Sequence, residues 1–169
     1  PLGIGTNAAQ PLILGTNQVE RARIDASGNL GLGVVPSAWS GAKALQVSNA
    51  GSFFSDGVVF GWKIGIAANA YRTGSATWAY QNTGIASTRI ESDSGSPFAV
   101  FTAPSGTAGN AITFTQTMLL DQSGNLGLGV APSAWSSVYK TTQLGLGASL
   151  SGRSDLSNYL ELQTNAFRS

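Results

Sequence analysis

Several residue types that carry chemistry are missing from this sequence. It has no cysteine, which excludes disulfide bonds and thiolate metal sites, and no histidine, the commonest metal ligand and general base. Charged residues make up 10 % of the chain, against about 25 % in typical globular proteins, and the formal net charge is +1. This balance provides no electrostatic footprint for nucleic acid or an anionic membrane. No apolar run reaches the roughly 18 residues of a membrane-spanning helix.

The remaining composition indicates a folded protein that belongs to a large assembly. Apolar residues make up 42 % of the 169 residues, which is enough for a buried core. A surface of Ser, Thr, Asn, Gln and Gly suits an extracellular or virion assembly better than a dispersed soluble protein. The chain begins at Pro1 and its single methionine is internal, at position 118, so we expect a piece of a longer or processed protein.

One stretch of the sequence occurs twice. Residues 25–40 return as residues 121–136, with 14 of 16 positions identical at an offset of 96. A copy of this quality indicates a structural repeat. We therefore divide the chain into N-terminal strands at residues 1–24, a first unit at 25–120, and an incomplete second unit at 121–169. Because the sequence stops within the second unit, we expect more of the repeat to follow.

The repeated stretch predicts a hairpin. Its first five residues are turn formers, in which an aspartate bonds the backbone ahead of it and a glycine supplies positive φ. Leu30, Leu32 and Val34 then alternate with Gly31 and Gly33, so one face of the strand is apolar and the other is bare. We expect the bare face to admit a neighbouring strand of another chain. The residues of this repeated hairpin are Asp25, Gly28, Asn29, Gly31, Gly33 and Trp39, and Asp121, Gly124, Asn125, Gly127, Gly129 and Trp135.

The rest of the chain predicts an all-β fold. Short apolar or threonine-rich alternating segments recur at 43–47, 60–66, 77–81, 86–91, 98–101 and 111–120, and turn formers separate them. Residues 53–57 and 71–75 are predicted as turns. Residues 154–162 could form a capped helix, but at the repeat offset they align with residues 58–66, so we predict a strand. Gln46 aligns best with Gln143, an offset of 97, which indicates one inserted residue.

The repeat resembles a known family. Residues 21–33, Arg-Ala-Arg-Ile-Asp-Ala-Ser-Gly-Asn-Leu-Gly-Leu-Gly, and residues 101–116 are similar to the repeats of bacteriophage tail fibres and side-fibre proteins. The resemblance implies repeated short antiparallel strands and hairpins that form an elongated homotrimeric β-fibre, β-helix-like or β-prism-like. It also implies a virion location outside the cell, attachment to a host, and contacts with tail or baseplate proteins and with a surface glycan or outer-membrane receptor.

Two other functions remain open at this point. A bacterial trimeric surface adhesin or secreted fibre could use the same repeat, and a capsule-degrading spike is the third and least favoured reading. We predict no enzyme, cofactor or metal site, since an aspartate copied in every unit reads as a turn residue and the chain lacks histidine. The glycines at 31 and 33 lack the sequel of a phosphate loop.

Four aromatic residues are the candidate contacts with a receptor or glycan. Exposed aromatic rings stack on sugars, and a strand at 77–81 would place two of these rings on one face. Aromatic residues on strands are more often core residues, however. The candidates are Trp62, Tyr71, Trp78 and Tyr80. Trp39 and Trp135 recur with the hairpin, and we predict that they are packing residues.

Overall fold

The computed structural model describes residues 5, 8–56, 63–155 and 159–164. Every regular element within these ranges is a β-strand, which confirms the all-β prediction. Hydrogen bonds join thirteen of the fifteen described strands in one mixed sheet, in the order β1-β2-β3-β4-β5-β6-β9-β10-β11-β12-β13-β14-β15, and β7 and β8 form a second sheet. Nothing helical in these ranges is long and apolar enough to cross a membrane.

The chain forms two compact units, and β9 (Ser87–Ser92) contributes residues to both. Unit 1 comprises residues 1–89 and 103–113, and unit 2 comprises residues 90–102 and 114–169. The predicted boundaries at residues 25 and 121 mark the sequence repeat and do not coincide with these units. Unit 1 holds β1 (Leu12–Thr16), β2 (Val19–Ile24), β3 (Leu30–Leu32), β4 (Lys43–Val47), β5 (Gly51–Ser55), β6 (Ile64–Ala68), β7 (Ala70–Arg72) and β8 (Trp78–Tyr80). Unit 2 holds β10 (Phe98–Ala103, except its last residue), β11 (Thr115–Leu120), β12 (Leu126–Leu128), β13 (Tyr139–Leu144), β14 (Ala148–Arg153) and β15 (Leu160–Thr164).

The sequence repeat is a repeat of structure. Strands β2 to β6 of unit 1 correspond to β11 to β15 of unit 2, and the registers agree, since Ala22 lies opposite Leu32 and Met118 opposite Leu128. The offset is 96 at β2 and β3, 97 at β4 and 96 again at β6. The inserted residue lies in the loop before β13, and this confirms the alignment of Gln46 with Gln143.

One pairing in each unit departs from the predicted antiparallel arrangement. β3 pairs with β4, and β12 with β13, in parallel. Parallel neighbours need a crossover, and here the connections at 33–42 and 129–138 contain no helix. The sequence pattern did not predict this crossover, because alternation indicates a strand but carries no information about its direction.

Three predicted boundaries are wrong. Residues 71–75 were predicted as a turn, but Tyr71 and Arg72 lie in β7, and the chain bends at residues 74–76. Residues 53–57 were predicted as a turn, but Phe53 and Phe54 lie in β5, and the chain turns at residues 48–50, where Ser48 has a φ of 52°. β11 begins at Thr115, and Ala111 forms only an isolated bridge with Ala79. The strand prediction for 154–162 is confirmed where β15 begins at Leu160, whereas residues 156–158 lie outside the described ranges.

Gly31 and Gly127 each lie close to the crossover that follows them in the same chain. A Cβ on Gly31 would lie 2.2 Å from the Val34 carbonyl oxygen and 2.9 Å from Pro36 Cδ, and on Gly127 the matching distances to Val130 and Pro132 are 2.1 and 2.9 Å. The predicted approach of another chain at Gly31 is therefore wrong, because the crossover of the same chain fills the bare face. Gly33 and Gly129 instead supply positive φ, at 66° and 70°.

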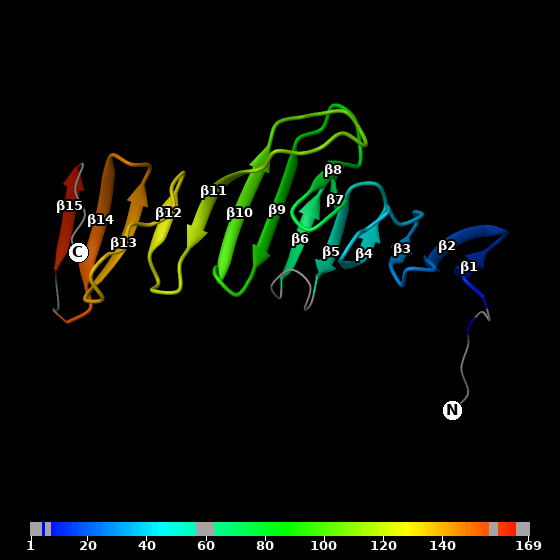
Figure 1. The fold of residues 1–169 in the computed structure, drawn as a ribbon, viewed down its shortest axis with the longest axis horizontal. Coiled ribbons are helices and arrows are strands. Elements are labelled where there is room, and N and C mark those ends of the chain that lie inside the picture. The colour runs from blue at the N-terminus through cyan, green and yellow to red at the C-terminus, as the bar shows by residue number, and fades with distance from the viewer. Residues whose placement is uncertain (1–4, 6–7, 57–62, 156–158, 165–169) are drawn as a thin grey trace. The chain divides into compact units, whose positions relative to one another are not determined.

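The core of unit 1 lies between the sheet and the β7–β8 hairpin (Figure 1). Trp39, Phe54 and Trp78 are each less than 7 % exposed, and their ring centroids lie 5.1 to 6.0 Å apart. Trp135 is buried at the equivalent place in unit 2. Both repeated tryptophans are thus packing residues, as predicted.

We predict that Gly127→Ala destabilises unit 2 by about 1–3 kcal/mol, because the new methyl group overlaps the Val130 carbonyl group. Gly147→Ala is the control, since Gly147 has no positive φ and nothing lies within 4 Å of its Cβ position. Urea denaturation of both variants measures the difference. Equal midpoints for the two variants would contradict the assignment.

Candidate functional site

The repeated aspartate closes a turn and has no catalytic geometry. Asp25 Oδ1 accepts the backbone N–H of Asn29 at 2.8 Å, and Oδ2 accepts the Asn29 side-chain amide at 3.0 Å. Asp121 and Asn125 repeat these bonds at 2.8 and 3.1 Å. The part of the chain that the structure describes holds no group of three or more acidic, histidine or cysteine residues that could bind a metal ion. The turn interpretation of the motif is confirmed.

The surroundings of the Asp25 carboxylate favour its charged form. Burial raises its pKa, but hydrogen bonds from the Asn29 side chain and from the backbone N–H groups of Asn29, Ser27 and Gly28 outweigh that effect, so its pKa is lowered. A carboxylate that accepts several N–H bonds gains stability when ionised. The charge on Asp25 therefore stabilises the turn.

In each unit, buried side-chain amides hydrogen-bond the turn to the strand after the crossover, and that strand to the crossover itself. Asn29 is 1 % exposed, and its Oδ1 accepts the backbone N–H of Ala44 at 3.1 Å. Gln46 Oε1 accepts the backbone N–H of Ser37 at 2.9 Å and the Trp39 indole N–H at 3.3 Å. In unit 2, Asn125 bonds Thr141 at 3.1 Å and Gln143 bonds Ser133 at 2.9 Å. Sequence reasoning aligned the glutamines but did not predict this role.

The predicted aromatic contacts are not brought together on the surface. Trp78 and Tyr80 are 3 % and 6 % exposed, and the Tyr80 hydroxyl donates to the Pro104 carbonyl at 2.8 Å. A glycan-contact role does not fit their packing. Tyr71 is half-buried on β7 and remains a candidate, and Trp62 lies outside the described residues.

A buried ion pair anchors the hairpin that covers these rings. Asp56, which follows β5, pairs with Arg72 of β7, and their side chains are 0 % and 3 % exposed. Arg72 also donates to the carbonyl oxygens of Gly74 and Ser75. The pair is structural, since Asp56 directly follows β5, and Gly74 and Ser75 lie in the turn between β7 and β8.

The surface feature that stands out in unit 1 is an exposed apolar sheet face, here called the outer face. One row crosses the sheet by register, with one side chain from each of six strands. Phe53 is 60 % exposed and Ile24 and Ile66 are each 42 % exposed, which is unusual for large apolar side chains that adjoin one another. The row consists of Leu12, Ile24, Leu30, Leu45, Phe53 and Ile66, and beside it run Leu14, Ala22, Leu32 and Val47.

Unit 2 has the same outer face. Leu150 and Leu162 are 43 % and 74 % exposed, and the second row includes Leu128 and Leu144 at 38 % and 48 %. The only polar residue of the first row is Thr142. That row consists of Phe98, Leu120, Leu126, Thr142, Leu150 and Leu162.

Each outer face has a shallow groove beside a lysine. The groove in unit 1 has a volume of about 290 Å³ and is lined by Leu30, Phe53 and Lys43 among others, and its counterpart of about 250 Å³ in unit 2 includes Leu150 and Lys140. Small-molecule sites usually enclose about 300–1,000 Å³. Both grooves lie just below this range.

Sequence reasoning found only part of the outer face. The predicted stripe of Leu30, Leu32 and Val34 is right for the two leucines, whereas Val34 lies beyond β3 in the crossover. Phe53 was missed because its segment was predicted as a turn. The sequence of β5, Gly-Ser-Phe-Phe-Ser, has no alternation of apolar and polar residues, so no periodic signal marked Phe53 as a strand residue.

We predict that Asp25→Asn lowers the stability of unit 1 at neutral pH, and that its difference from the unsubstituted chain shrinks as the pH falls. The folded-state pKa of Asp25 lies below the ordinary aspartate value of about 3.9, so its contribution is present above that value and is lost as the pH falls through the folded pKa. Thermal unfolding of both chains between about pH 3 and pH 7 measures this difference. A difference independent of pH would contradict the role of the charge.

Comparison with known proteins adds no family to this description. No protein-family model matches the chain. No curated protein is significantly similar to it. The argument about function therefore depends on the repeat motif and on the geometry of the outer faces.

Proposed function

We propose that this chain is a structural segment of a bacteriophage tail fibre, a homotrimeric β-shaft that serves attachment to a host cell. The observation that supports this proposal is the outer face of each unit, where large apolar side chains from six strands adjoin one another in solvent. The repeat at residues 25–40 and 121–136, with its resemblance to tail-fibre repeats, supports the same function.

A large exposed apolar face is expected to be buried against another protein surface. Apolar area removed from water contributes roughly 25 cal/mol per Å², and monomeric proteins rarely expose contiguous patches beyond a few hundred Å². Three copies around an axis would turn their outer faces inward, and closed symmetry is the ordinary way to satisfy such surfaces.

The proposed segment has a structural role in attachment. The repeated elements of each unit serve turns, crossovers and packing, and some of the described charged residues form ion pairs within the chain, such as Arg23 with Glu20 and Arg153 with Asp155. Attachment to the host would use surfaces other than these, of which half-buried Tyr71 is the remaining candidate in the described chain.

We predict that the chain sediments as a trimer and that Phe53→Lys weakens association by about ten- to a hundredfold, because a charge replaces an apolar side chain at the interface. Ile85→Lys is the matched control, since Ile85 is 54 % exposed but lies outside the strands of the outer face. Sedimentation equilibrium over a concentration series measures both variants.

Two results would contradict the proposal. The first is sedimentation of the chain as a monomer at micromolar concentration, because the outer face would then not be an assembly surface. Equal weakening by the two substitutions would show that the effect of Phe53→Lys comes from added charge and not from the face.

A further inference from the structure

The two units share one scaffold but differ on the face opposite the outer face, here called the inner face. By the repeat alignment, Ala44 corresponds to Thr141, Phe54 to Ser151 and Ala67 to Gln163. Gly65 of unit 1 likewise corresponds to Glu161 of unit 2. At these four positions the inner face is therefore more polar in unit 2, whereas at a fifth Ala42 corresponds to Tyr139, whose ring centroid lies 6.5 Å from that of Trp135.

In unit 1 the inner face is the wall of an intrachain core. The β7–β8 hairpin lies on it, with the rings of Phe54 and Trp78 5.1 Å apart and the Arg72–Asp56 pair beside them. Burial of these side chains supplies the hydrophobic stabilisation of a folded domain without any partner. Among the described residues, the buried apolar side chains of this unit are Trp39, Ala42, Ala44, Phe54, Ala67, Ala70, Trp78, Ala79, Tyr80 and Ala103.

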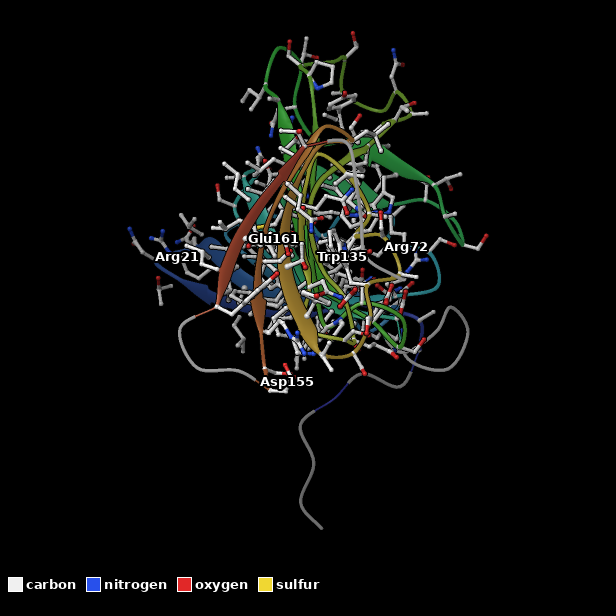
Figure 2. All side chains as sticks on the ribbon, turned by 90° about the vertical axis from the view of Figure 1, so that its left-hand side faces the viewer. Arg21, Arg72, Trp135, Asp155 and Glu161 are labelled. Carbon is white, nitrogen blue, oxygen red and sulfur yellow. The ribbon has the colours of Figure 1, made fainter. Side chains whose placement is uncertain are left out.

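In unit 2 the inner face supplies little of this stabilisation. The buried apolar side chains among its described residues are Ala99, Trp135 and Tyr139. Thr141 and Ser151 are buried and hydrogen-bond each other at 3.0 Å, at the positions where unit 1 has the apolar Ala44 and Phe54. Figure 2 labels Trp135 and Glu161, which belong to this unit.

The large apolar side chains of unit 2 are instead on its outer face. Leu150, Leu160 and Leu162 are 43 %, 73 % and 74 % exposed. Burial of apolar area is the dominant favourable contribution to folding. In an isolated copy of the chain, most of the large apolar side chains that could stabilise unit 2 are exposed to solvent.

We infer that the outer face of unit 2 is an obligate interface with further copies of this chain, so that unit 2 folds only when it is covered, whereas unit 1 keeps its fold when the copies separate. The apolar rows favour a second copy as the occupant because they contain no charged residue. The lysine beside the groove of unit 2, Lys140, donates to the Ser123 carbonyl oxygen of its own chain at 2.5 Å, and closed symmetry brings identical apolar rows together. This inference rests on the proposed function, and adds that the two units differ in their dependence on assembly.

Hydrogen exchange of the full chain, followed by mass spectrometry across a dilution series, tests this inference. Peptides over β13 and β14 in unit 2 are compared with the matched peptides over β4 and β5 in unit 1, and sedimentation reports association in the same samples. On dissociation, exchange in β13 and β14 is expected to accelerate by about tenfold or more, while β4 and β5 retain most of their protection. Leu150→Lys should produce the same pattern without dilution, and Phe53→Lys, at the equivalent position in unit 1, should leave β4 and β5 protected.

The outcomes separate this inference from the proposed function. Association with continued protection of β13 and β14 in the dissociated chain overturns the inference alone. Equal loss of protection in both units also overturns it, because unit 1 would then depend on assembly as much as unit 2. A chain that remains monomeric at every concentration overturns the interface and the proposed function together.

Discussion

The parallel crossover between β3 and β4, repeated between β12 and β13, is the constraint on which the rest of the structure depends. This ten-residue connection contains no helix, and it must cross the sheet so that β4 runs parallel to β3. Its backbone N–H and C=O groups have no regular hydrogen-bond ladder, so each needs a separate partner. The Gln46 side chain accepts the N–H group of Ser37 within the crossover, and the Asn29 side chain accepts the N–H group of Ala44 in β4, just after the crossover. Both amides are nearly inaccessible to water, so their hydrogen bonds are expensive to lose.

The crossover also explains why each unit has two different faces. The connection, with Trp39 or Trp135, lies on the inner face, where Gly31 and Gly127 make room for it. Among the described residues no segment covers the outer face in this way, and the alternation of the strands places the large apolar side chains there. In unit 1 a hairpin completes the inner core, whereas unit 2 has polar residues at the corresponding positions. One scaffold is thus stabilised in two ways, within the chain in unit 1 and, as we propose, between chains in unit 2.

Much of the local structure could be predicted from the sequence, since the relevant interactions are local. The turn from Asp25 to Asn29 depends on residues four apart, and β4 follows the alternation of its own side chains. The predicted turn at Phe53 failed because Ser, Asp and Gly nearby are turn formers, and the pairing of β5 with both β4 and β6 overrode that preference. Trp78 and Tyr80 failed as surface candidates for a similar reason, because a strand pattern shows which side chains share a face but not which other segments pack on that face. Trp78 and Tyr80 are buried by residues distant in sequence, such as Phe54 and Pro104.

By itself the sequence determined the all-β class, the repeat, the hairpin turns and the packing role of Trp39 and Trp135. These follow from residue periodicity, turn chemistry and internal duplication, which are properties of short segments. Only the tertiary structure decided the direction of β4 and β13, the occupant of the bare face at Gly31, and which apolar side chains remain in solvent. The physical reason is that direction and burial arise from contacts between segments that adjoin only after folding, and such contacts leave no periodic signal in either segment alone.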